Sequence, residues 1–197
     1  MAKLSRDTLW SLEEYANRRA DFRQQVLEHK KPRQLMLGEH VHLLFEDETT
    51  IRYQIQEMLR IEKVFDAEGI EDELEAYNPL IPDGSNWKAT MLIEYDDVEV
   101  RKRELARLIG IEKAIWFQVD GCERVTPICN EDLERDNEHK TSSVHFMRIE
   151  LTPEMVAAVR SGAKVFAGVD HPNYQVSSLE IPSDTRDALA KDLAEVH

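Results

Sequence analysis

The chain has 197 residues, of which 42% are hydrophobic and 32% are charged, and its formal net charge is −14. This composition is that of an ordinary globular protein, and no apolar run reaches the roughly 20 residues that a membrane-spanning helix needs. An acidic chain repels phosphate backbones, so nucleic acid is not expected as a partner. The N-terminus lacks the apolar segment of a secretory signal, and the two cysteines, Cys122 and Cys129, are expected to be free thiols. We therefore expect a cytoplasmic protein without membrane contact.

The first half of the sequence predicts mainly helices. Ser11 and Glu14 have the spacing of a capping box at a helix start. Gly38-Glu39 suits a two-residue hairpin turn, and Gly69 separates two later helices. The expected elements are a helix over 11–30, strands over 33–37 and 40–45, and helices over 49–65 and 70–77.

The second half predicts alternating strands and helices. Asp96 or Asp97 caps a helix that ends at Gly110, and Asp120-Gly121 is a strong hairpin signal. The expected strands are 89–95, 114–119, 124–129, 144–151 and 164–170, with helices over 153–161 and 183–195. Together these predict an α+β fold with a mixed, largely antiparallel sheet that several helices cover. We expect a single domain over 1–197, with a seam near 78–88.

Glu62 is the most anomalous residue of the sequence. The apolar residues of the helix over 49–65 fall on one stripe at about 100° per residue; they are Ile51, Ile55, Met58, Leu59 and Phe65. Glu62 falls near the middle of this stripe, and a carboxylate that faces a core is costly unless it is paired, bound to a metal or protonated. Glu62 is therefore expected to pair with an arginine of a neighbouring element, to bind a metal, or to act as a general acid or base.

Several histidines are candidates for chemistry. His40 and His42 alternate with apolar residues and share one strand face, although exposed histidines beside a turn are the commoner case. His145 lies on an apolar strand face, where a hydrogen-bonded core histidine is the usual finding. His171 follows Asp170 at the end of a strand, a common position for ligand sites.

These residues could form a metal site for iron, zinc or manganese, with Glu62, His145 and His171 as the leading ligands and His40 and His42 as weaker ones. A parallel crossover through the helix over 153–161 would keep His145 and His171 about 20 Å apart. Only an antiparallel return would bring them together.

The charge is unevenly distributed. Residues 1–37 contain eight Lys/Arg and five Asp/Glu, whereas the remainder contains 17 Lys/Arg and 34 Asp/Glu. Either the basic N-terminal helix packs on an acidic body, or it forms a docking surface for a protein partner. Common signatures of metalloproteases, hydrolases and nucleotide-binding proteins are absent.

Five stretches resemble a known family: SLEEY at 11–15, RYQIQEMLRIEK at 52–63, YNPLIPDG at 77–84, KTSSVHF at 140–146 and GVDHPNY at 168–174. Over nearly its whole length the chain resembles a bacterial domain-of-unknown-function family, number three-five-zero-one. The resemblance implies no established activity or catalytic residue. Such proteins are often encoded beside rubrerythrin and an iron–sulfur oxidoreductase, which implies a redox or peroxide-stress context.

Three functions remain open. The leading hypothesis is an accessory protein of a cytoplasmic redox system that acts through a partner surface, with or without a bound metal. The second is a small enzyme with Glu62 as acid or base, Arg52 or Arg148 as an anion clamp, and the 78–88 loop as a lid. The third is a structural adaptor without a site. The sequence is compatible with an oligomer.

Overall fold

The computed structural model describes residues 3–132, 135 and 139–194. The helices are α1 (Leu12–Lys30), α2 (Glu48–Glu62), α3 (Ala67–Tyr77), α4 (Val98–Arg107), α5 (Pro153–Arg160) and α6 (Ser183–Ala190), with 3-10 turns η1 (Arg6–Thr8), η2 (Asn78–Leu80) and η3 (Ile111–Lys113). The strands are β1 (Gln34–Leu37), β2 (Val41–Glu46), β3 (Asn86–Ile93), β4 (Ile115–Val119), β5 (Arg124–Val125), β6 (Ile128–Cys129), β7 (Val144–Glu150), β8 (Val165–His171) and β9 (Tyr174–Glu180). None of the helices in the described ranges is long and apolar enough to span a membrane.

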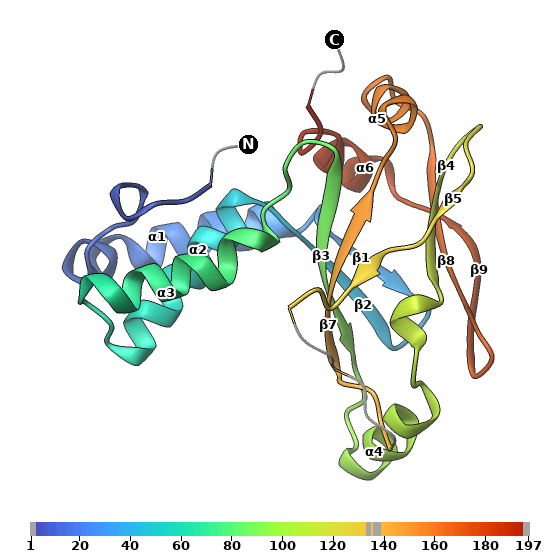
Figure 1. Cartoon of the computed structure of the whole chain (residues 1–197), viewed down its shortest axis with the longest axis horizontal. Helices are drawn as coiled ribbons and strands as arrows, with labels where there is room; N and C mark the ends of the chain where they lie inside the picture. The colour runs from blue at the N-terminus through green and yellow to red at the C-terminus, as the bar shows by residue number, and fades with distance from the viewer. Residues whose placement is uncertain (1–2, 133–134, 136–138, 195–197) are drawn as a thin grey trace.

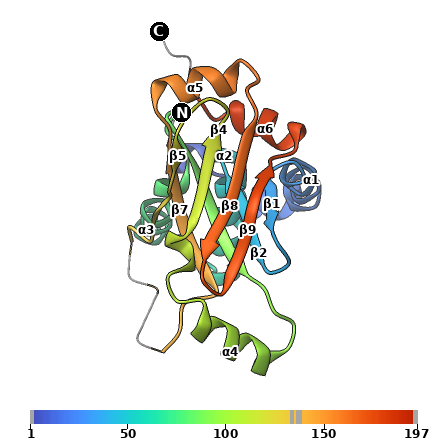
Figure 2. The same ribbon diagram turned by 90° about the vertical axis from the view of Figure 1, so that its right-hand side faces the viewer.

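The strands form a five-stranded sheet of order β1-β2-β3-β7-β6 and a four-stranded sheet of order β5-β4-β8-β9. This arrangement confirms the α+β class. A mixed sheet was expected, but every pairing between the described strands is antiparallel. The helix α5 leads the chain from β7 in one sheet to β8 in the other, so no parallel pair forms between these strands. Figures 1 and 2 show the two sheets face to face, with α5 and α6 at one end and α4 at the other.

The main hydrophobic core lies between the sheets. Inward side chains of both sheets contribute to one buried cluster, as the alternating burial of β2 illustrates. Phe117 of β4 meets Phe45 and Trp87 of the opposite sheet edge-on, with ring centroids 6.3 and 6.4 Å apart. Trp87 Nε1 also donates to Leu189 O at 3.0 Å, which fixes α6 over the end of this core.

The helices α1, α2 and α3 form a layer on the side of the five-stranded sheet that faces away from the four-stranded sheet (Figures 1 and 2). This layer has its own small apolar cluster, made of Leu4, Ile51, Ile55, Leu59, Leu74 and Ile81. The stripe predicted on α2 is therefore correct for three of its members, Ile51, Ile55 and Leu59.

The far end of that stripe was predicted wrongly. α2 begins after the N-cap Asp47 and ends at Glu62, because Lys63 adopts a left-handed conformation with φ of 57°. Phe65 lies beyond the helix and is 80% exposed, and Glu62 is also exposed. The predicted burial of Glu62 is wrong, because Glu62 is the last residue of α2 and the apolar cluster that covers Ile51, Ile55 and Leu59 does not reach it.

A partly buried carboxylate of α2 is that of Glu57. It accepts a hydrogen bond from Tyr15 Oη at 2.7 Å and two from Arg19, at 2.7 and 2.9 Å. These bonds, those from Arg19 above all, lower the pKa of Glu57 to about 2. The ion pair expected for Glu62 is thus made by a residue earlier on the same helix, and it joins α2 to the basic helix α1.

A second ion pair, which is fully buried, fixes the C-terminal part of the chain. Arg33, which is 3% exposed, lies 2.5 Å from Asp192 through Nη2. Its guanidinium also donates to the carbonyls of Phe45 and Glu46, at 3.2 and 3.1 Å. The segment after α6 is thereby anchored beside the start of β1.

Two strand predictions need correction. The predicted hairpin over 114–129 begins as expected with β4 and β5, but Pro127 interrupts the second strand and β6 pairs with β7 in the other sheet. The strand β9 was not predicted. It pairs with β8 through the turn at Pro172-Asn173, and most of its side chains are exposed.

Candidate ligand-binding groove

His145 and His171 lie in different sheets and have separate partners. Asn130 Nδ2 lies 3.0 Å from His145 Nδ1, and His145 Nε2 lies 2.9 Å from Thr141 Oγ1, so this buried histidine is a hydrogen-bonded core residue. His171 Nδ1 accepts from Asn173 N at 3.2 Å, so its Nε2 can donate to a backbone carbonyl 3.1 Å away.

The other histidines lie elsewhere again. His40 stacks on Tyr95 at 4.0 Å, and His42 lies 3.1 Å from Gln34 Oε1 and 3.5 Å from Glu94 Oε1. Within residues 3–132, 135 and 139–194, no group of three His, Cys, Asp or Glu side chains could hold a metal ion. The metal site predicted from the sequence therefore gains no support.

A groove lies between the helical layer and the outer face of the five-stranded sheet. Its volume is about 910 Å³, compared with 510 and 610 Å³ for two other hollows. One wall consists of α3 and the chain that follows it, and the other consists of β3 and β7. The apolar side chains that line it are Met58, Ala76, Tyr77, Pro79, Leu80, Ile81, Phe146 and Met147.

Several residues of the segment 78–88, where the sequence predicts a seam, line the groove. Asn78 stabilises this wall, because its side chain accepts from Leu4 N and donates to Leu4 O, both at 2.9 Å. The predicted lid loop thus lines the groove, while neither Glu62 nor Arg52 does. That the chain forms one domain stays a prediction.

Arg148 lines the groove but is already occupied. Its guanidinium donates twice to Glu131, at 2.9 and 2.8 Å, and once to Glu150 at 2.7 Å. All three guanidinium nitrogens are used by carboxylates of the chain itself. Arg148 is therefore not the free anion clamp that the enzyme hypothesis needs.

Lys88 is the half-buried cation of the groove without a hydrogen-bond or ion-pair partner among the described residues, whereas Lys3, which also lines the groove, is exposed. Lys88 lies on β3 directly opposite Arg148 of β7, with a half-buried side chain. Its ammonium makes no hydrogen bond or ion pair with the residues that the structure describes. Burial, and next the charge of Arg148, lowers the pKa of Lys88, although the nearby carboxylates of Glu131, Asp83 and Glu150 act in the opposite direction.

Glu73 is the corresponding carboxylate on the helical wall. It lies on α3, is half-buried, and has no hydrogen bond or ion pair with the described part of the chain. Burial raises the pKa of Glu73, and the neighbouring charges of Glu62 and Asp72 raise it further. Glu62 does not line the groove, but its negative charge raises the pKa of Glu73, which does.

Lys88 and Glu73 were not predicted from the sequence. In the sequence, each is one charged residue among many. In the fold, the pKa of Lys88 is lowered and that of Glu73 is raised, so both shifts favour the neutral form, which is frequent at functional sites. The alternation of β3 does place Lys88 on the face opposite Trp87 and Ala89. Only the tertiary fold shows that a helix covers that face.

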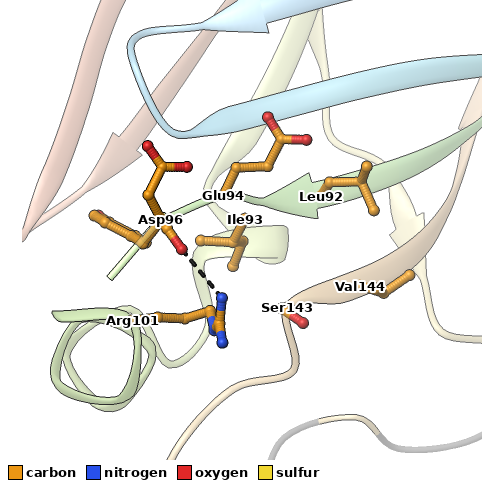
Figure 3. Close-up of a pocket in the computed structure, with 8 residues that line it drawn as sticks. Leu92, Ile93, Glu94, Asp96, Arg101, Ser143 and Val144 are labelled. Carbon is orange, nitrogen blue, oxygen red and sulfur yellow. Dashed lines mark hydrogen bonds between the residues drawn. The ribbon is translucent and has the colours of Figure 1, made fainter. Parts of the chain in front are cut away.

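The two smaller hollows are more open. Figure 3 shows one of them, where Arg101 of α4 extends toward the ends of β3 and β7. Arg101 Nη1 donates to Tyr95 O at 3.1 Å, so this arginine already has a backbone partner. In the other hollow, Arg124 stacks 3.6 Å above the Trp116 ring and lies 3.1 Å from Asp170. In these hollows the described arginines are therefore already committed to partners of the chain itself.

The fold and the groove define an α+β protein with two antiparallel sheets and a helical layer that encloses a surface site. The chain belongs to the family described as "Protein of unknown function (DUF3501)", whose model matches residues 3–193. The resemblance seen in the sequence is thereby confirmed.

A solved structure shares this fold. It is the crystal structure of a novel protein of unknown function from Burkholderia pseudomallei K96243, which is 51% identical to this chain with a TM-score of 0.94. The match covers 98% of this chain and 100% of the other. No curated protein matches the chain.

Proposed function

We propose that this protein binds a small molecule in the groove between α3 and the outer face of β3 and β7. The observation that supports this function best is Lys88, a half-buried ammonium without a partner among the described residues. A charged group that is shielded from water and unpaired destabilises the folded protein. A ligand that pairs with this group therefore stabilises the folded state. The apolar lining around Lys88 would bury the remainder of such a ligand.

If the protein is an enzyme, the groove offers Lys88 and Glu73 as its acid–base residues in place of Glu62 and Arg52. Lys88, with its lowered pKa, supplies a base or nucleophile, and Glu73, with its raised pKa, supplies an acid. Glu62 and Arg52 have no place in the groove. The redox partner implied by the family resemblance stays a prediction, as does the cytoplasmic location.

A fragment library screened by two-dimensional NMR tests the binding function. We expect the perturbed resonances to cluster around the groove. Ala76, an exposed residue that lines the groove, offers a blocking variant, Ala76→Trp, which should abolish these shifts. Ala106→Trp is the matched control, because Ala106 is also exposed on a helix but lies outside the groove. Fragments that bind A76W and the wild type alike would refute a ligand site in the groove.

A further inference from the structure

The ionisable side chains of the groove divide into those already paired and those still free. Arg148 is bound by short hydrogen bonds to both Glu131 and Glu150, and the three side chains together keep one negative charge. Asp83 accepts from the backbone and side chain of Ser85, both at 3.1 Å. Among the half-buried groups of the groove, Lys88 and Glu73 are left without partners in the described part of the chain.

These two free charges stand on opposite walls. Lys88 belongs to β3 in the sheet, and Glu73 belongs to α3 in the helical layer. No ion pair joins them. The charges that perturb Glu73 are those of Glu62 and Asp72, and Lys88 is not among them. The ammonium and the carboxylate therefore form no internal ion pair across the groove.

The surface between them is largely apolar. Met58 of α2, Leu80 and Ile81 contribute aliphatic groups, and Phe146 contributes an aromatic ring from β7. An apolar body that spans this surface would lose water-exposed area on binding, at roughly 25 cal/mol per Å². Charged ends would meet Lys88 and Glu73 while this body covers the middle.

The structure assigns to the groove an extended zwitterion with an anionic end at Lys88, a cationic end at Glu73 and an apolar middle. This assignment rests on the proposed function and names its ligand class. A ligand that is only anionic fits less well, because the acidic groups Glu73, Glu75, Asp83, Glu131 and Asp132 line the same groove. A zwitterion is neutral overall and complements both walls.

Isothermal titration with matched probes tests the ligand class. The zwitterionic probe is ω-aminocaprylate, and its half-charged counterparts of equal chain length are caprylate and octylamine. We expect ω-aminocaprylate to bind at least about tenfold more tightly than either counterpart, because it pairs with both walls. Equal affinity for caprylate and ω-aminocaprylate would overturn the assignment.

Variants of the two walls locate each end of the probe. Lys88→Met should weaken ω-aminocaprylate and caprylate about tenfold but leave octylamine unchanged, whereas Glu73→Gln should weaken ω-aminocaprylate and octylamine only. Lys88→Arg keeps the charge and should retain binding, which separates loss of the contact from loss of the fold. Glu71→Gln is the matched control on α3, because Glu71 is exposed and does not line the groove.

The outcomes separate the ligand class from the proposed function. If caprylate binds in a Lys88-dependent manner and Glu73→Gln changes nothing, the zwitterion is refuted and the binding groove stands. If none of the three probes binds, the zwitterion is refuted. The groove itself is refuted only if the fragment screen also finds no hits that A76W removes.

Discussion

Replacing Glu57 by glutamine is the sharpest test of what holds the helical layer together. The change keeps the shape of the side chain and removes its charge. In the wild type, Glu57 accepts hydrogen bonds from Tyr15, Arg19 and Arg60, and its side chain is only 13% exposed. The E57Q variant would leave the guanidinium of Arg19 half-buried beside a neutral amide.

The size of the effect follows from the displaced pKa. The pKa of Glu57 is about 2 in the folded protein, compared with 4.5 for an unperturbed glutamate. This difference corresponds to about 3 kcal/mol of stability, since each pKa unit contributes about 1.4 kcal/mol. Because the folded-state pKa is lowered, the contribution is complete above the unfolded-state pKa of 4.5 and is lost as the pH falls toward 2. We expect E57Q to lose about 2–3 kcal/mol at neutral pH and to approach the wild type in acid.

Urea unfolding followed by circular dichroism measures this difference across the acid range. Glu62→Gln is the matched control on the same helix. It lies at the exposed C-terminal end of α2, where a negative charge is slightly unfavourable, so its effect should stay within about 0.5 kcal/mol. The reasoning fails if E62Q destabilises as much as E57Q, or if the stability of E57Q falls as steeply with acid as that of the wild type.

Three further predictions concern the rest of the molecule. Gly168→Ala should cost about 1–3 kcal/mol in thermal unfolding, because a Cβ there would collide with Cζ2 of the Trp116 ring; an unchanged melting temperature would contradict this contact. Asp192→Asn should cost about 1–3 kcal/mol by urea unfolding, because buried Arg33 loses its nearest carboxylate and keeps only Asp47, 3.5 Å away; a neutral result would show that the pair with Asp192 adds nothing. After brief acylation near neutral pH, peptide mapping should find Lys88 more modified than other lysines of similar exposure, because its lowered pKa favours the reactive free amine. Modification that depends on exposure alone would argue against the lowered pKa.

Local patterns predicted most helices of this fold because their signals are local. Ser11 does cap α1, Asp97 caps α4, and Thr152 followed by proline starts α5. The end of α2 lacked such a signal. Lys63 takes a left-handed conformation that usually favours glycine, and nothing in the neighbouring residues indicates it. The prediction extended the helical period to Phe65, which lies beyond the helix, and so placed the exposed last residue, Glu62, in the middle of a buried stripe.

Sheet membership was harder to predict than strand positions. The segment over 124–129 does form strands, yet its two halves belong to different sheets, because Pro127 lacks an amide donor and ends the first pairing. β9 escaped prediction since Ser177, Ser178 and Glu180 give it no apolar face. Long-range pairing, not local preference, decides both cases.

The candidate site depends on the same long-range information. The sequence analysis singled out Glu62 because it lay on the apolar stripe of its helix. Glu73 breaks no such pattern in α3, and Lys88 is an ordinary outward-facing residue of β3. Both side chains are half-buried in the groove between the helical layer and the outer face of the sheet. A site formed by residues of two separate elements has no sequence motif within either element. Arg148 and the 78–88 loop do line the groove, yet which of its charges remain free is decided by Glu131 and Glu150.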